Sequence, residues 1–410
     1  MNPINKLEEF RLGGSHEDST IEFANTLRGL AALFVVVSHY LSAFWYKRES
    51  IAHLINAPLL TPETHATPFY VGWLNPFPLF DWGAYGVGLF FIISGFVIPF
   101  SLQKTNSISF FVNRFFRIVP TYAVGFSFTL MALFLGGKFF GAAWPYTFKE
   151  IIFHYLPGIR DIFASRNIDV IVWTLEVEMK FYLIAALFVI WFRRYSLTVF
   201  FIPTLLFLLN CYMSHRIPEW ATTNFVAFIG AETYMMSAQY IIFIFIGVVL
   251  HYVHCHQIKP DLGYFIIGTL FAMFCIAWWS GPYSGNLILA WSYAFALLTF
   301  LFASIFPHFF KANPVFNFWA RISYPLYVIH SIAGYIALRM MLEMKFEIWL
   351  SLSIVISASL LLSWLLHVFI EQPLRRVGKK LAEKLNNNFR VSPMLLKKMI
   401  KSSSLKPSQN

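Results

Sequence analysis

Apolar stretches alternate with polar segments along almost the whole chain, and most of these stretches are long enough to cross a bilayer. An α-helix needs about 20 apolar residues to span the hydrocarbon core. Ten such windows are present: 26–45, 84–102, 118–137, 171–192, 196–213, 234–253, 262–280, 285–306, 321–341 and 347–370. The pattern predicts an all-α polytopic membrane protein, a bundle of about ten transmembrane helices.

Basic residues are concentrated near the two ends of the chain. Ten of the 31 Lys and Arg lie from Arg375 to Lys406, after the last predicted span, while Lys6 and Arg11 precede the first one. Because basic flanks stay on the cytoplasmic side of a membrane, we expect both termini to be cytoplasmic. The expected divisions are a cytoplasmic N-terminal segment (1–21), a transmembrane domain (22–376) and a basic cytoplasmic tail (377–410).

The composition excludes several other classes of protein. Apolar residues make up 58% of the chain and charged residues only 12%, whereas a soluble domain has about a quarter charged. The net charge of +11 comes without a nucleic-acid recognition motif, so we expect no nucleic-acid partner. The three cysteines lack CxxC spacing, and neither disulfides nor a metal site are expected. The first twenty residues lack an apolar core, so the first span is expected to act as its own insertion signal.

Two long polar segments, 46–83 and 138–170, face the outside in this topology, and loops of this size usually have a function. A third segment, 103–117, is predicted to form an amphipathic stretch on the cytosolic face. Three glycines in the second span are expected to let a neighbouring helix approach closely. They are Gly86, Gly88 and Gly95.

The first span contains two ionisable residues, Arg28 and His39. Eleven residues make three helical turns to within about 20°, so both side chains project from one face, about 16 Å apart along the helix. With Arg28 near the cytosolic boundary, His39 lies near the middle of the membrane. Ionisable groups at that depth are costly and usually functional. The alternative is a core histidine that bonds to a neighbouring helix.

The fourth predicted span carries Glu178, about 10 Å below the outer surface. Since His39 is expected at a similar depth, the carboxylate and the imidazole are candidates for a general base and the group that orients it. In the alternative reading, Glu178 and Lys180 only hold helices together. Residues two apart do not face each other on a helix, which weakens that alternative.

The ninth predicted span places Ser323, Tyr327 and His330 on one stripe. A polar stripe is costly in lipid, so it faces the bundle, either as a wall of a substrate channel or as polar contacts between helices. At the cytosolic face, Arg114 and Arg117 are three apart and suit recognition of a phosphate group. They also fit an ordinary basic anchor at the inner surface.

Taken together, these segments resemble the acyltransferase-3 family of bacterial integral-membrane acyltransferases. The resemblance covers residues 22–376 through six motifs in order, and each motif alone is weak. The motifs are 25–39, with ten residues between Arg28 and His39; 86–96; 114–120; 173–182, of the form Trp-Ser-Leu-x-x-Glu-x-x-Phe-Tyr; 323–330; and 371–373. Thr174 stands where the family commonly has Ser.

The resemblance implies an O-acetyltransferase of the cell inner membrane. Its expected donor is acetyl-CoA, and its expected acceptor is a hydroxyl of an envelope glycan, such as O-antigen or exopolysaccharide, or of a lipid-linked sugar. On this reading Arg28, Arg114 and Arg117 hold the acyl-CoA, and His39 is the base, helped by Glu178. The residues expected to line the substrate path are Trp173, Tyr182, Ser323, Tyr327 and His330.

Two alternatives stay open. A transporter or flippase for a glycan or another polar solute would also bury ionisable groups, although repeated halves or matching broken helices are typical of such folds and neither is evident here. A membrane acyltransferase that acts on a lipid or another non-sugar acceptor is the second. The sequence does not disclose the acceptor, the exact acyl group or the oligomeric state.

Overall fold

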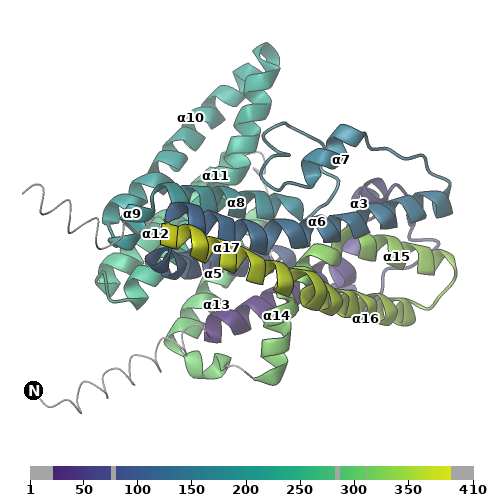
Figure 1. The fold of residues 1–410 in the computed structure, drawn as a ribbon. Helices are drawn as coiled ribbons and strands as arrows, with labels where there is room; N and C mark the ends of the chain where they lie inside the picture. Colours follow the sequence, from purple (N-terminus) through teal and green to yellow (C-terminus); the bar gives the residue numbers. More distant parts are fainter. Residues whose placement is uncertain (1–21, 75–79, 282–286, 312, 389–410) are drawn as a thin grey trace, which may run out of the picture.

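The computed structural model describes residues 22–74, 80–281, 287–311 and 313–388. In these residues the secondary structure is helical, with no β-strand, and the helices lie side by side in a bundle (Figure 1). The predicted all-α membrane architecture is therefore confirmed. The predicted N-terminal segment 1–21 and residues 389–410 lie outside the described residues, so the cytoplasmic placement of both termini stays a prediction.

Each of the ten predicted windows contains a helix, but they are not ten equal spans. In the described part of the chain, seven helices are long and apolar enough to cross a membrane, or eight if a bent pair counts as one. These helices are Glu22–Tyr46, which includes the π-helix η1 (Ser38–Ala43) and α2 (Phe44–Tyr46); α5 (Trp82–Lys104); α6 (Ser107–Phe140); η2 (Leu197–Phe200) with α10 (Phe201–Thr223); α11 (Phe225–His254); α12 (Pro260–Trp279); and α16 (Ile348–Leu366), which continues through the π-helix η4 (His367–Glu371) into α17 (Gln372–Asn388).

Three of the predicted spans are built differently. The ninth is a broken helix, in which α14 and α15 meet at an angle of 70°. The fourth is a short helix followed by a one-turn helix, and the eighth is a shorter apolar helix. Their bounds are α14 (Pro314–Ile329), α15 (Ser331–Glu343), α8 (Val172–Leu187), α9 (Val189–Arg193), α13 (Leu287–Ile305) and η3 (Pro307–Phe310).

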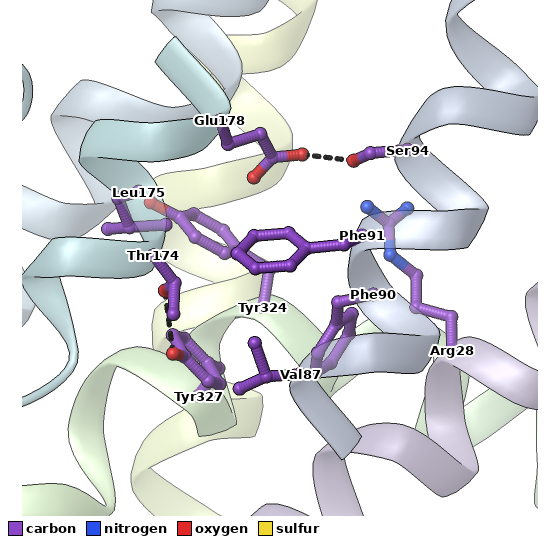
Figure 2. A pocket seen from close by; sticks show the side chains of 10 residues that line it. All are labelled: Arg28, Val87, Phe90, Phe91, Ser94, Thr174, Leu175, Glu178, Tyr324 and Tyr327. Carbon is purple, nitrogen blue, oxygen red and sulfur yellow. Dashed lines mark hydrogen bonds between the residues drawn. The ribbon is translucent and has the colours of Figure 1, made fainter. Parts of the chain in front are cut away.

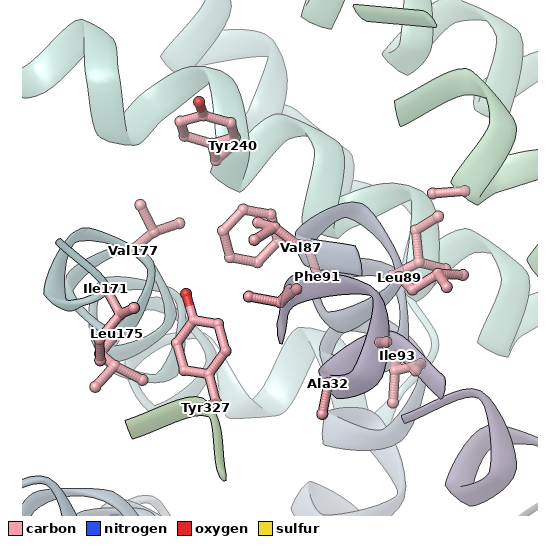
Figure 3. Close-up of a cluster of buried hydrophobic side chains, with 14 of the residues drawn as sticks. Ala32, Val87, Leu89, Phe91, Ile93, Ile171, Leu175, Val177, Tyr240 and Tyr327 are labelled. Atoms are coloured by element: carbon pink, nitrogen blue, oxygen red, sulfur yellow. The ribbon is translucent and has the colours of Figure 1, made fainter. Parts of the chain in front are cut away.

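Helices α5 and α11 form the centre of the bundle. A side chain at Gly95 would overlap the backbone carbonyl oxygen of Ile244, and one at Gly247 would overlap that of Ile92. The two backbones are therefore in direct contact, as small residues allow in membrane helices. This confirms the close approach predicted for the second span. Figure 3 shows the apolar side chains of α5 packed between those of α8 and α11.

The two long outer segments are partly helical. They contain α3 (Arg48–Ile55), α4 (Phe69–Leu74) and α7 (Phe148–His154), and Figure 1 shows α3 and α7 away from the end of the bundle where α9 lies. His154 joins α7 to the segment before α8: its Nδ1 donates to the Glu150 carbonyl at 3.1 Å, and its Nε2 accepts from the Ile168 amide at 2.8 Å. Burial lowers the pKa of His154 to about 4, so the neutral ring makes both bonds.

The segments predicted to lie at the cytosolic face are built differently from the prediction. Residues 107–117 are the first turns of α6, a helix of 34 residues and hence about 51 Å long. The first part of the predicted tail is also ordered, since α17 packs along α6. A side chain at Gly378 would overlap Phe116, and the Asn386 side chain accepts from the Asn106 amide at 3.1 Å.

Candidate active site

His39 lies where the first helix widens into the π-helix η1. Such π-helical turns cost helical regularity and are frequent at functional sites. The His39 Nδ1 lies 3.0 Å from the hydroxyl of Tyr335 on α15, and the two rings are within 7° of parallel. This bond leaves Nε2 as the nitrogen available for chemistry. His39 lines a cavity of about 230 Å³ that also contacts the outer segments through Ile51 and Val170.

His330 sits at the break between α14 and α15, and its ring centroid is 4.8 Å from that of His39. Its Nδ1 donates to the Leu326 carbonyl at 2.9 Å. Its buried Nε2 has no hydrogen-bond partner among the described residues. Since His330 is fully buried and is not among the residues that line the cavity, it lies behind His39.

A residue of the first helix, Tyr40, stabilises the break between α14 and α15. The hydroxyl of Tyr40, the residue after His39, donates to the His330 carbonyl and lies 2.9 Å from Ser359 Oγ. Gly334 is needed beside it, because a side chain there would overlap the Tyr40 ring. The π-helix and the helix break are thus held together, and they fix the relative positions of His39, His330 and Tyr335.

The predicted pair of His39 and Glu178 is not formed. Glu178 instead accepts from Ser94 Oγ at 2.5 Å and from the hydroxyl of Tyr182. It lines a separate, smaller cavity of about 40 Å³ together with Arg28, and Figure 2 shows Glu178 and Ser94 joined across that cavity. Both groups lie within the bundle, but on the walls of different cavities.

A third cavity, of about 230 Å³, lies at the end of the bundle that is predicted to face the cytosol, and is called the cytosolic cavity below. Its charged side chains are Arg28, Arg117, Arg321, Arg375 and Glu371, four cations against one anion. His367, in the π-helix η4, donates from Nδ1 to the Glu371 carboxylate at 2.6 Å. The excess of guanidinium groups suits a ligand with several phosphate charges.

Arg114 does not line this cavity, so the geometry does not support its expected role beside Arg117, which stays a prediction. It is only 6% exposed, donates to Ser101, and its guanidinium lies 5.5 Å from the Phe110 ring and 5.6 Å from the Tyr182 ring. Because three residues are less than a full turn of α6, the two side chains point about 60° apart around the helix axis. Arg114 therefore faces the core while Arg117 faces the cavity.

Each of the three cavities shares lining residues with the next one across the bundle. The cytosolic cavity and the small one share Arg28 and Tyr324. The small cavity and the one that contains His39 share Val87 and Tyr327. The Tyr327 hydroxyl lies 2.6 Å from Thr174 Oγ1, and Figure 2 shows this contact on the cavity wall. The three cavities therefore lie next to one another, in a row from the basic end of the bundle to His39.

Three of the five residues predicted for the substrate path line these cavities: Ser323 at the cytosolic end, Tyr327 in the middle and Trp173 beside His39. The other two, Tyr182 and His330, are buried behind the walls and support Glu178 and His39.

Two residues of the site were missed. No sequence pattern pointed to Tyr335, because only the bend after His330 brings it to His39. His367 could have been found from its spacing, since it lies four residues before Glu371 on a helix and the two side chains therefore share a face. In the described residues no group of three His, Cys, Asp or Glu side chains is arranged to hold a metal ion.

Comparison with known proteins adds independent information. A family model described as an acyltransferase domain, of the acyltransferase-3 type, matches residues 21–368. Over 140 residues the chain is 30% identical to Nodulation protein 10 of Rhizobium leguminosarum bv. viciae, and that match covers 30% of this chain and 38% of the relative. No solved structure matches the chain.

Proposed function

The chain belongs to the acyltransferase-3 family, and from this premise we propose that it moves an acyl group from cytosolic acyl-CoA to a hydroxyl of a cell-envelope carbohydrate. Acetyl-CoA is the donor we expect, and the cell inner membrane is the site we expect. The observation that carries the proposal is the row of three adjacent cavities between the arginines of the cytosolic cavity and His39.

The cytosolic cavity is the proposed donor site. Arg117, Arg321 and Arg375 would hold the phosphates of CoA, as guanidinium groups hold phosphates elsewhere. The uncharged arm of the donor then follows the route past Arg28 toward His39. The middle cavity is narrow, at about 40 Å³, so passage of the thioester requires the side chains around Tyr327 to move apart.

The cavity that contains His39 is the proposed reaction site. The acceptor hydroxyl gives its proton to Nε2 of His39 as its oxygen attacks the thioester carbonyl carbon. The new ester C–O bond forms, the C–S bond breaks, and the leaving CoA sulfur takes up a proton. Tyr335 holds the other ring nitrogen, which fixes the direction of the ring and its tautomer. Glu178, bonded to Ser94, would act on the route and not as the partner of His39.

The proposal is tested with membranes that contain either the wild-type protein or His39→Ala. We expect the wild type to consume acetyl-CoA when an envelope glycan is supplied, and His39→Ala to insert and fold normally but to lose transfer by about 10²–10⁴-fold. Wild-type turnover by His39→Ala would exclude the assigned base. Movement of a glycan without any consumption of acyl-CoA would indicate a transporter instead.

The acceptor class is tested in cells. Envelope glycans from cells with and without the gene are compared by mass, and the proposal predicts one missing acyl increment per modified unit when the gene is absent. If the glycans are identical and the increment is missing from a protein or an unglycosylated lipid, the carbohydrate assignment is wrong.

A further inference from the structure

A fourth, larger cavity opens on the flank of the bundle, between α8, α10, α11 and the segment 161–164. Its volume is about 720 Å³. Apolar side chains form its rim, and four of them, Ile162, Phe163, Phe225 and Val226, are between 61% and 81% exposed. In the neighbouring span 197–223, only 17% of the most apolar stretch is buried inside the protein. Figure 1 shows α10 leaning away from the bundle. In a membrane this groove therefore faces lipid.

The inner end of the groove is polar. The Lys180 ammonium donates to the Asp161 carboxylate and to Ser237 Oγ, the latter at 2.6 Å. Asp161 is 10% exposed, and its other oxygen, Oδ1, is buried without a hydrogen-bond partner among the described residues. A buried carboxylate oxygen in that state lacks a donor, and a ligand hydroxyl would supply one.

A polar cavity of about 280 Å³ continues from this end and shares Asp161 and Ser237 with the groove. It adds Arg160, Glu176 and Glu232, and Arg160 forms two bonds to Glu176, at 2.7 and 2.6 Å. With Lys180, the two cavities hold two cations and three carboxylates. This balance disfavours a strongly anionic head group, while carboxylate oxygens are good acceptors for hydroxyl groups.

The polar cavity lies next to the proposed reaction site. Trp173 lines both the polar cavity and the cavity that contains His39. Its ring lies 4.8 Å from that of Tyr240, so it is held as a fixed aromatic surface, of the kind on which the apolar face of a sugar stacks. Hydrocarbon groove, hydroxyl-binding cavity and candidate base therefore follow one another in space.

We propose that the groove between α8, α10 and α11 binds the hydrocarbon chain of the acceptor, a lipid with an uncharged, hydroxyl-rich saccharide head. The lipid enters sideways from the bilayer, its head binds beside Asp161 and Trp173, and one hydroxyl reaches His39. This inference rests on the proposed function, because it takes the cavity of His39 as the reaction site.

The groove offers a blocking variant that leaves the fold intact. Gly230 lines the groove on α11, and a Cβ at this position meets no atom within 4 Å. Gly230→Trp therefore places an indole in the open groove. Gly268 on α12 is equally open and does not line the groove, so Gly268→Trp is the matched control.

The probe is glucosyl diacylglycerol in phosphatidylethanolamine vesicles, and the readout is the amount of glycolipid that stays bound in native mass spectrometry. We expect retention by the wild type and Gly268→Trp, and at least about tenfold weaker retention by Gly230→Trp. Equal retention by all three proteins, or none by the wild type, would overturn the inference. So would displacement of the glycolipid by an equal amount of phosphatidylglycerol, which would make an anionic phospholipid the occupant.

A second measurement separates this inference from the proposed function. With a water-soluble oligosaccharide as acceptor, Gly230→Trp is expected to keep wild-type transfer, while His39→Ala loses it. If His39→Ala transfers normally, the proposed reaction site is wrong whatever the lipid binding shows. If Gly230→Trp binds and acylates the glycolipid normally, the groove is wrong and the reaction site stands.

Discussion

The hydroxyl of Tyr335 is the contact through which the broken helix acts on the candidate base. Tyr335→Phe removes this hydroxyl, which lies 3.0 Å from His39 Nδ1. It keeps the ring, whose centroid is 5.6 Å from that of His39. The variant thus leaves the packing in place and deletes one hydrogen bond. If Tyr335 positions His39, the imidazole of the variant rotates or changes tautomer for part of the time.

The size of the effect follows from that single bond. A neutral hydrogen bond contributes about 0.5–1.5 kcal/mol net, and about 1.4 kcal/mol corresponds to a tenfold change in rate. If all of it is expressed in the transition state, kcat falls about 2- to 13-fold. Removal of the base itself costs about 10²–10⁴-fold, so the two variants separate a positioning residue from a base.

The assay is transfer of radiolabelled acetyl from acetyl-CoA by purified protein in nanodiscs, with kcat and the donor KM measured for each variant. We expect Tyr335→Phe to lower kcat and to leave the donor KM unchanged. Tyr85→Phe is the matched control, since it removes a buried hydroxyl bonded to Thr299 at 2.9 Å, and it should leave kcat unchanged. Unchanged kcat in Tyr335→Phe, or a further loss when it is added to His39→Ala, would refute the reasoning.

Three further predictions concern the donor site, the helix packing and the outer loop. Arg117→Ala should raise the donor KM about tenfold, since it loses a charge-assisted hydrogen bond, with kcat unchanged; an unaltered KM would exclude a phosphate contact. Gly95→Ala forces the new methyl group against the carbonyl of Ile244 and should destabilise the protein by about 1–3 kcal/mol, seen as a lower Tm than that of Gly268→Ala. Burial lowers the pKa of His154 to about 4, so its neutral ring stabilises the outer loop above about pH 6.5, the unfolded value, and this contribution is lost as the pH falls toward 4. Proteolytic cleavage of the loop should become faster as the pH falls through that window. Equal cleavage rates of the loop at pH 5 and pH 7, after correction for the protease's own pH dependence, would contradict the assignment.

The sequence predicted the parts of the fold that depend on periodic hydrophobicity. Long apolar windows became helices, and Gly95 met the backbone of the next helix as expected, because only small residues permit such contact. The π-helix at His39 and the 70° bend after His330 were not predicted. Both depend on tertiary contacts, such as the bond from Tyr40 to the backbone of His330, which no local pattern contains.

The sequence predicted which residues belong to the candidate site better than it predicted which of them contact each other. Depth along a helix follows from residue number, so His39 and Glu178 were correctly expected to lie inside the bundle. The direction in which each one faces depends on how the helices are rotated, and the sequence does not specify that rotation. For the same reason Arg117 reached the cytosolic cavity while Arg114 turned into the core.

The connection between the cytosolic cavity and His39 is tested most directly by the sidedness of transfer. Everted membrane vesicles, with the cytosolic face outward, are supplied with radiolabelled acetyl-CoA, which does not cross the bilayer. Label on the envelope glycans inside the vesicles, protected from an added esterase until the vesicles are opened and absent with His39→Ala, is the predicted result. Label that appears only on glycans at the outer face, on the same side as the donor, would contradict a route across the membrane.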